Sequence, residues 1–304
     1  MPATEMEGGD TPGVKSGDVT APAVKSPAIS SPSTGKPPLI ATEPIDPVAA
    51  AEDRGVGIRI ATYNINWGNP SLTEVAKAIR AARADVVCFQ ETTAESERFL
   101  RRQFSGEYDE IAFTGGDGTY IADRFGILSR LPIADRTFYE KSDGLFGFWL
   151  LRLRLEDGEI QVANLHLTPF SVHPEAGETM WSAMQAVEAA HELEISRVIE
   201  SLSEDAPVIV LGDFNSMSWM IAPTTLVNHG FIDSFASLHA AADAQPTWHW
   251  FVGDIELTGR IDYIFHDRHF RALESEVIES EASDHWLLVT RLVLKTRGSD
   301  GTRD

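Results

Sequence analysis

The chain has 304 residues, of which 46 are acidic and 25 basic, and its formal net charge at pH 7 is −21. So acidic a chain repels polyanions at long range, which argues against tight, sequence-independent binding of duplex DNA. Cys88 is the only cysteine, which excludes an intrachain disulfide, and no apolar run approaches the roughly 20 residues of a membrane helix.

Residues 1–55 are rich in Pro, Ser, Thr, Ala, Gly and Lys. Such a segment buries too little apolar surface to fold, so we expect a disordered tail or linker. Residues 56–296 are predicted to form one domain, and 297–304 a disordered C-terminal tail. The N-terminus has no basic region followed by an apolar stretch, so we expect no signal peptide and, by default, a cytoplasmic protein. We expect a monomer without a protein partner or transmembrane segment.

The first half of the domain alternates strands with helices. An alternating strand over 58–64 leads into a turn, after which Ser71 is placed to cap a helix that runs through Arg83. Cys88 lies in a buried strand over 85–91, where a small hydrophobe is expected rather than a reactive thiol. The remaining elements are a helix over 92–104 and strands over 125–129 and 133–139.

The second half begins with a hairpin whose arms, 151–155 and 160–166, alternate around an Asp-Gly turn. A long helix is predicted over about 178–202. The β-branched run over 208–211 indicates a strand buried on both faces. The elements after it are a loop containing Trp219 and Pro223, then strands near 260–265, 271–278 and 286–294.

Strands outnumber helices in this series, and hairpins mix with strand–helix–strand units. The pattern predicts an α/β (α+β) fold in which two mixed, mainly antiparallel sheets pack face to face with helices outside. Polar side chains stand where the strands end or begin. They are Asn64, Gln90-Glu91, His166, Asp213 with Asn215, Asp262, and Asp284-His285. Strand ends gathered at one rim are where α/β folds usually place their sites.

These side chains suit metal-assisted hydrolysis. Glu91 and Asp284 are hard oxygen ligands for Mg²⁺ or Mn²⁺, and no Cys/His cluster offers a zinc site. His166 and His285 could donate to a phosphoryl oxygen or protonate a leaving group, with Asp262 fixing tautomer and charge.

Asp213 could activate or orient water, while Asn215 holds the water or a phosphate oxygen. Each residue also has a structural alternative when it is taken singly. These alternatives are an Asx turn after Asp213, a turn at Asn64, a helix cap at Glu91, an ion pair of Asp284 with Arg291 or another base, and a structural His166. The seven histidines other than His166 and His285 are interpreted as surface or loop residues. Six such coincidences in order along one chain favour the functional interpretation.

Six motifs carry a resemblance to a known family. They are Thr62-Tyr63-Asn64, Gln90-Glu91-Thr92, Asn164-Leu165-His166-Leu167, Gly212-Asp213-Phe214-Asn215, Arg260-Ile261-Asp262-Tyr263 and Ser283-Asp284-His285. The series resembles the endonuclease/exonuclease/phosphatase superfamily, which includes pancreatic deoxyribonuclease, AP endonucleases, inositol-phosphate 5-phosphatases and bacterial sphingomyelinases. The resemblance covers about residues 58–294. It implies a four-layered α/β sandwich and Mg²⁺-dependent hydrolysis of a phosphate ester.

The resemblance also implies a set of metal-binding residues. Glu91 would bind the metal ion, with Asn64 and Asp284 completing its surroundings. The chain departs from the family pattern near this position. Some AP endonucleases carry an Asp two residues after the first Asn, where this chain has Asn66.

The catalytic roles implied by the resemblance fall to five residues. Asp213 would position or deprotonate the attacking water, helped by Asn215. His285 and His166 would stabilise the phosphoryl transition state, and Asp262 would orient one of them. Attack would be in-line, with metal and imidazolium charge meeting the oxyanion.

The motifs specify the reaction, whereas the loops decide the substrate. Aromatic residues near the motifs could pack beneath the site, or form a rim that stacks unpaired bases or meets an apolar leaving group. These residues are Trp67, Phe170, Trp181, Trp219, Trp248, Trp250 and Trp286. The leading hypothesis is a phosphodiesterase, with nucleic acid (single-stranded or small) the first substrate class to test. The alternatives are a phosphatase or phospholipid phosphodiesterase of the same superfamily, and a catalytically inactive binding module.

Overall fold

The computed structural model describes residues 57–69, 71–115, 123–142, 144–156, 158–169 and 179–295. The tails predicted over 1–55 and 297–304 lie outside these ranges, as does Phe170 of the predicted aromatic rim. Within the described ranges the chain forms two six-stranded sheets, a two-stranded ribbon and four α-helices.

The first sheet is built from both ends of the described chain. Its strand order is β13 (Phe270–Ile278), β14 (Leu287–Leu294), β1 (Gly57–Asn64), β2 (Val86–Gln90), β4 (Arg124–Ser129) and β3 (Glu110–Gly115). β1 and β2 are parallel, and every other neighbouring pair is antiparallel. The parallel pair is central, so its carboxyl-terminal ends lie together at one rim.

The second sheet holds the middle of the chain. Its strand order is β5 (Ile133–Tyr139), β6 (Phe148–Leu155), β7 (Gly158–His166), β8 (Val208–Asp213), β12 (Asp262–His266) and β9 (Ile232–Asp233). Here β7 and β8 form the central parallel pair, and the other pairs are antiparallel. Both sheets therefore have the same plan, although the sequence shows no repeat.

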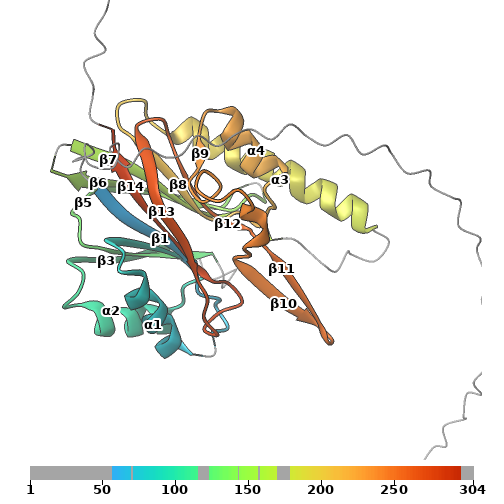
Figure 1. Cartoon of the computed structure of the whole chain (residues 1–304), viewed down its shortest axis with the longest axis horizontal. Coiled ribbons are helices and arrows are strands. Elements are labelled where there is room, and N and C mark those ends of the chain that lie inside the picture. The colour runs from blue at the N-terminus through green and yellow to red at the C-terminus, as the bar shows by residue number, and fades with distance from the viewer. Residues whose placement is uncertain are drawn as a thin grey trace, which may run out of the picture. The chain divides into compact units, whose positions relative to one another are not determined.

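Helices cover the outer faces of the two sheets (Figure 1). α1 (Leu72–Ala82) and α2 (Ala94–Phe104) pack on the first sheet, whereas α3 (Met180–Ser201) and α4 (Ile221–Asn228) pack on the second. The four layers confirm the predicted fold class. Among the described residues, no helix is long and apolar enough to cross a membrane.

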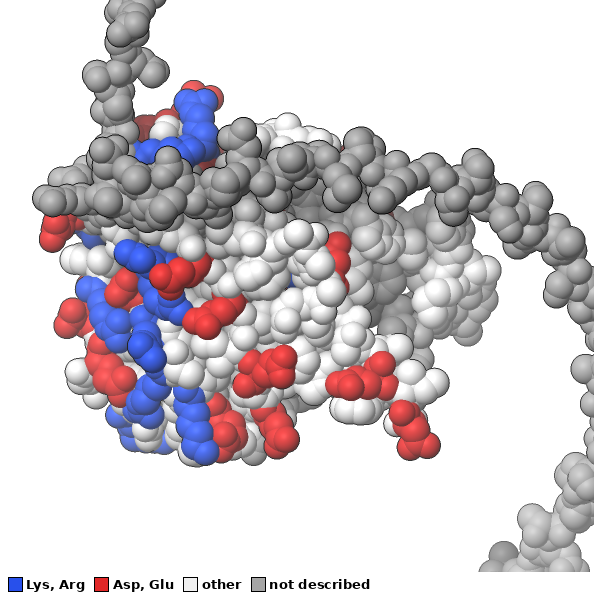
Figure 2. Space-filling model, in the orientation of Figure 1, with Lys and Arg blue, Asp and Glu red and all other residues white. Residues whose placement is uncertain are grey.

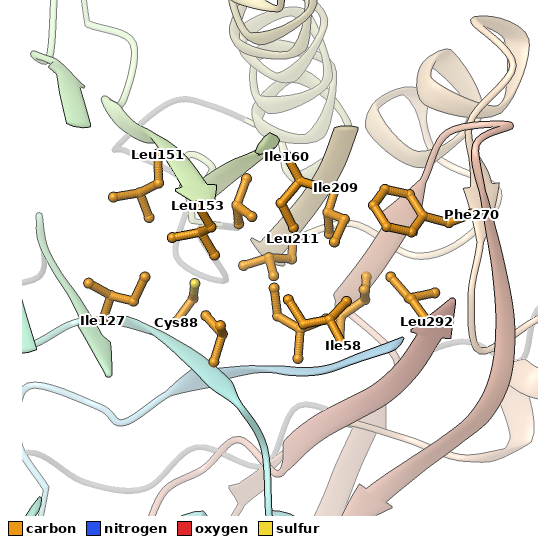
Figure 3. Packing of buried hydrophobic residues seen from close by; sticks show 14 of the residues in the cluster. Ile58, Cys88, Ile127, Leu151, Leu153, Ile160, Ile209, Leu211, Phe270 and Leu292 are labelled. Carbon is orange, nitrogen blue, oxygen red and sulfur yellow. The ribbon is translucent and has the colours of Figure 1, made fainter. Parts of the chain in front are cut away.

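A large cluster of buried apolar side chains lies between the two sheets (Figure 3). Ile58 and Ile60 of β1 belong to it, while Ala61 and Tyr63 pack on the helix side, because side chains alternate along a strand. Cys88 is fully buried in the same cluster, and burial raises the pKa of its thiol far above the usual value. The prediction of a small buried hydrophobe is confirmed.

Three segments differ from the sequence prediction. Pro223 lies inside α4 rather than in a loop, because it occupies the third helical position, where a backbone N–H has no intrahelical acceptor. The segment after it forms an unpredicted ribbon of β10 (Trp248–Val252) and β11 (Ile255–Gly259), which projects from the sheets (Figure 1). β3 is likewise unpredicted, because its pattern of apolar and polar residues is short and irregular.

Gly212 allows β8 to approach β7 closely just before the rim. Its φ is +142°, and a Cβ atom there would lie 1.9 Å from the carbonyl oxygen of Leu165. We expect Gly212→Ala to lower the free energy of unfolding by about 3 kcal/mol or more, because the backbone must move. Urea unfolding followed by circular dichroism measures the loss. Gly106→Ala, where a Cβ atom meets nothing within 4 Å, is the matched control, and equal stability of the two variants would contradict this role.

Candidate active site

The site lies at the rim where the central strands of both sheets end. β1 ends at Asn64, β7 ends at His166, and Glu91 directly follows β2. Asp213 ends β8 and lies opposite Asp262, the first residue of the antiparallel strand β12. The polar strand ends therefore come from both sheets and meet at a single rim.

Asn64 joins the two sheets at this rim. Its Nδ2 donates to Glu91 Oε1 at 3.1 Å and to Asp213 Oδ2 at 2.9 Å, so one amide group holds a carboxylate from each sheet. Its Oδ1 accepts a bond of 3.0 Å from the backbone N–H of Asn66. Glu91 Oε2 accepts another, of 3.1 Å, from the backbone N–H of Trp67. Asn64 thus positions carboxylates rather than presenting its oxygen.

His285 and Asp262 form a buried pair. His285 Nδ1 lies 2.9 Å from Asp262 Oδ2, and His285 Nε2 lies 3.6 Å from Asp213 Oδ2. Burial alone would lower the pKa of His285, but the carboxylates of Asp262 and Asp213 outweigh this effect and raise it to about 10. Burial raises the pKa of Asp262 to about 6, against the opposing effect of His285. The two carboxylates thus favour the charged form of His285, whose Nδ1 is placed to donate to Asp262 Oδ2.

His166 lies between two carboxylates. Its Nε2 is 3.7 Å from Glu91 Oε1 and 3.6 Å from Asp213 Oδ2. The ring packs edge-on against Phe146, with 5.6 Å between centroids. Asp213 Oδ2 therefore has two imidazoles within 3.6 Å, those of His166 and His285.

Asp284 reaches the rim through its neighbours. Asn66 Nδ2 donates to Asp284 Oδ1 at 2.7 Å. The hydroxyl of Ser283 donates to the backbone carbonyl of Asn64 at 2.9 Å and accepts from the backbone N–H of His285 at 3.2 Å. These bonds tie the segment before β14 to the end of β1.

Backbone strain is concentrated in the site. Four non-glycine residues among those described have positive φ, and three of them are Asn66 (53°), Glu91 (56°) and Asn215 (47°). The fourth, Arg83, ends α1. Each such conformation costs on the order of 1 kcal/mol and is rarer for Glu than for Asn. Such strained residues at the ends of three strands are typical of a functional site.

All eight predicted site residues lie at or beside this rim, while their chemical roles remain predictions. Two structural alternatives are wrong. Glu91 does not cap the following helix, because Thr93 caps it. Asp284 does not pair with Arg291, whose carboxylate partner is Glu274.

The predicted turns do form. The side-chain oxygens of Asn64 and Asp213 each accept a bond from the backbone N–H two residues later. Asn215 Nδ2 donates to the carbonyl of Leu167 at 3.0 Å, which ties the segment after β8 to the segment after β7. A turn and a site role are compatible, because Asp213 uses Oδ1 for the turn and keeps Oδ2 beside the imidazoles.

Several supporting residues have no assigned role in the sequence prediction. Thr247 is fully buried, and its Oγ1 accepts bonds of 3.0 Å from the backbone N–H groups of Ile261 and Asp262. Gln90 Nε2, at the end of β2, donates to Asn164 Oδ1 on β7 at 2.6 Å and so links the sheets beneath the site. Gln90 and Asn164 stand inside the motifs and could have been found there, whereas a lone Thr carries no such signal.

Four carboxylates meet at the rim, those of Glu91, Asp213, Asp262 and Asp284. Their hydrogen-bond and ion-pair partners among the described residues are amide, backbone N–H, hydroxyl and imidazole groups, with no Lys or Arg. This excess of hard oxygen donors fits a divalent cation such as Mg²⁺ or Mn²⁺.

The carboxylates differ in how well they suit the ion. Asp213, Asp262 and His285 hold ligand atoms within 4.8 Å of one another. However, Nδ1 of His285 is already hydrogen bonded to Asp262. Glu91 and Asp284 fit the ion better than Asp262 does, because their oxygens, like those of Asp213, accept hydrogen bonds only from neutral groups.

Tryptophan side chains are exposed around the rim. Trp67 follows β1, Trp219 follows β8 and Trp250 lies on β10, with exposed fractions of 52%, 68% and 49%. Trp248 forms an isolated β-bridge with His285, which attaches the ribbon to the site. The alternative in which aromatics only pack beneath the site is therefore wrong for these three exposed residues.

Comparisons with known proteins agree with this architecture. A model of the Endonuclease/Exonuclease/phosphatase family matches residues 61–285. No curated protein matches the chain.

Solved structures with the same fold include an endonuclease/exonuclease/phosphatase from Beutenbergia cavernae (17% identity, TM-score 0.61, covering 78% of this chain and 72% of that one). Another is D. rerio TDP2 complexed with a single strand DNA product (16%, TM-score 0.60, 78% and 98%). A third is TDP2 from C. elegans (14%, TM-score 0.61, 81% and 78%). At these identities the likeness concerns the fold alone.

Proposed function

The chain belongs to the endonuclease/exonuclease/phosphatase family, and we propose that it is a divalent-metal-dependent phosphodiesterase with nucleic acid, single-stranded or small, as the first substrate class to test. Membership of the family makes it a hydrolase of phosphate esters. The observation that carries the finer proposal is the arrangement around Asp213. Its Oδ2 lies 3.6 Å from Nε2 of both His166 and His285, and Asp262 is hydrogen bonded to Nδ1, the other ring nitrogen of His285.

In this proposal Asp213 accepts the proton of the attacking water. Its carboxylate is held by Asn64 on one oxygen and by the backbone N–H of Asn215 on the other, so its orientation is set before substrate binds. The new P–O bond forms as the bond to the leaving oxygen breaks, in line with the attack. The leaving oxygen then takes up a proton from His166 or His285, and the proton that Asp213 accepted restores that imidazole.

The two histidines face the charge that develops on the phosphoryl group. The carboxylates of Asp262 and Asp213 raise the pKa of His285, which favours its charged form, and its Nε2 lies as close to Asp213 Oδ2 as that of His166 does. Donors aimed at an oxyanion in a buried site stabilise the transition state more than they would in water. Asp262 keeps the ring of His285 oriented.

The metal ion of this proposal would bind Glu91, with Asp284 and Asn64 around it. Bound there, Mg²⁺ or Mn²⁺ supplies Lewis-acid stabilisation of the phosphoryl oxygens. Asn64 contributes by holding Glu91 against Asp213, a carboxylate of the other sheet.

Two observations support a nucleic acid with unpaired bases. The structure of D. rerio TDP2 contains a single strand DNA product. The exposed rings of Trp67, Trp219 and Trp250 offer flat surfaces on which unpaired bases can stack. Duplex DNA is disfavoured, since the ribbon over 247–259 has no Lys or Arg. On the face shown in Figure 2, the Lys and Arg side chains gather on the side of α1 and α2. The charged side chains on the side of β10 and β11 are Asp and Glu.

A phospholipid phosphodiesterase or a phosphatase is the second candidate. One face of the ribbon is apolar, because Trp250 lies opposite Leu257 and both are exposed, as is Ile255. Such a face suits a substrate with an apolar leaving group. An anionic membrane is a poor match for the acidic ribbon.

An activity panel with Mg²⁺ tests these proposals. It compares single- and double-stranded DNA and RNA, nucleotides, inositol phosphates and zwitterionic phospholipid vesicles, all with the full chain. We expect cleavage of single-stranded nucleic acid and little of duplex DNA. Release of inorganic phosphate or a phosphorylated head group without nuclease activity would favour the second candidate. No hydrolysis of any substrate would leave the inactive binding module.

A further inference from the structure

Two buried polar residues on α3 take no part in the reaction described above. His191 and Glu194 are one helical turn apart and have exposed fractions of 0% and 2%. The interpretation of the seven other histidines as surface or loop residues is therefore wrong for His191, and also for His266, which is buried at the end of β12. Burying a carboxylate is costly unless its oxygens are hydrogen bonded, so the partners of Glu194 indicate what holds it in place.

Glu194 binds the two segments that flank His166. Its Oε1 accepts the backbone N–H of Phe146 at 2.7 Å and the hydroxyl of Thr168 at 2.6 Å, and its Oε2 accepts the backbone N–H of Thr168 at 3.1 Å. Phe146 packs its ring on His166, and Thr168 follows His166 by two residues. One carboxylate thus fixes both supports of the imidazole.

His191 connects the segment after β7 to the segment after β8. Its Nε2 lies 2.7 Å from the carbonyl oxygen of Thr168, and its Nδ1 lies 2.8 Å from the hydroxyl oxygen of Ser216. A carbonyl oxygen can only accept, so Nε2 carries a proton and donates it to that bond. Ser216 is three residues beyond Asp213, so His191 sets the spacing between two strand ends of the site.

We propose that Glu194 and His191 are positioning residues, which hold the ring of His166 against Asp213 without touching substrate. The effect of Glu194 and His191 on the position of the His166 ring is independent of the reaction, whereas their effect on kcat rests on the proposed function. Glutamine cannot replace Glu194, because its amide would face a backbone N–H of Phe146 or Thr168 with an NH₂ group. One of those two segments must then shift, and the ring of His166 shifts with it.

Kinetics of the full chain test the role. Glu194→Gln is expected to lower kcat about tenfold or more, while KM changes less than about threefold, because ground-state binding is unaffected. Glu192→Gln, exposed on the same helix, is the matched control and should leave kcat within about twofold. Thr168→Val removes the hydroxyl and should lower kcat, whereas Thr168→Ser keeps it and should restore activity. Equal rates for Thr168→Val and wild type would overturn the proposal.

A double-mutant cycle separates positioning from general weakening of the fold. If Glu194 acts through His166, Glu194→Gln costs far less in a His166→Ala background than in the wild type. The same fold loss in both backgrounds would overturn the positioning role, even if the single variant is slow.

A measurement without substrate keeps this inference separate from the proposed function. The imidazole NMR signals of His166 should shift in Glu194→Gln, while those of the exposed His269 should not. Unchanged His166 signals would overturn the inference. A wild-type chain that hydrolyses no phosphate ester would instead remove the proposed function, and the NMR comparison would still decide the positioning role.

Discussion

Replacing Asp213 by Asn is expected to lower kcat by about a hundredfold or more while the fold remains intact. The amide cannot take a proton from the attacking water, and it removes the negative charge that both imidazoles face at 3.6 Å. Steady-state rates on the best substrate of the panel measure the loss, and circular dichroism checks the fold.

The control for this variant is Asp267→Asn. Asp267 lies beside the opposite end of β8 and, like Asp213, is held on both carboxylate oxygens. Its Oδ2 accepts from the backbone N–H of Val208 and its Oδ1 from that of His269, both at 2.9 Å, and an imidazole lies near it too, with His269 Nδ1 2.9 Å from Oδ2. The strand separates the two positions by roughly 16 Å. Asp267→Asn should therefore lose comparable stability and keep its rate. A near-normal kcat in Asp213→Asn would contradict the proposal that Asp213 is the general base.

Removal of divalent metal is expected to abolish activity, and Mg²⁺ or Mn²⁺ should restore it. The four carboxylates have no Lys or Arg partner among the described residues, and the two nearby imidazoles can offset only part of their negative charge, so a divalent cation would reduce the remaining repulsion. Treatment with a chelator, followed by titration with each metal ion, gives the metal-ion concentration at which the rate is half-maximal.

Glu91→Gln should raise that metal concentration by about tenfold or more, because one hard, charged ligand is lost. Glu97→Gln is the control. Glu97 is similarly half-buried, with 25% of its side chain exposed against 16% for Glu91, but it is paired with Arg101 and Arg124 on α2 and β4. Activity that survives exhaustive chelation would end the claim of a metal site at Glu91.

Local signals explain why parts of the fold can be read from the sequence. The N-cap of α1 is Ser71, whose side chain accepts the backbone N–H of Glu74, and its C-cap is Arg83 in a left-handed conformation. Both ends were predicted, because a cap depends only on neighbouring residues. The hairpin of β6 and β7 was predicted for the same reason. α4 lacks such a local signal. The ribbon of β10 and β11 has one that the sequence prediction missed, because Gly253-Asp254 separates its two arms and Gly253 has a φ of 61°.

The candidate site shows the same limit. The order of the motifs indicates which polar residues meet, since strand ends of one sheet share a rim. It cannot show that Asn64 would present its amide nitrogen to Glu91 and Asp213, because that contact depends on how the two sheets pack. His191 and Glu194 are hidden for a related reason. In the sequence, a His and a Glu on a long helix look like residues of its solvent-exposed face, and only the tertiary structure shows that they are buried.

The pairing of β1 with β14 has a consequence for the synthesis of this protein. Gly57 lies opposite Val293 in that pair, so the central strand of the first sheet waits for a partner made more than two hundred residues later. During translation one edge of β1 stays unpaired, and such an edge is prone to wrong pairing with other chains. Asp284 and His285 lie just before β14, with only Trp286 between them and the strand. A chain whose last strand is still inside the ribosome therefore lacks two of the eight predicted site residues, and we expect catalysis only after nearly the whole domain has left the exit tunnel.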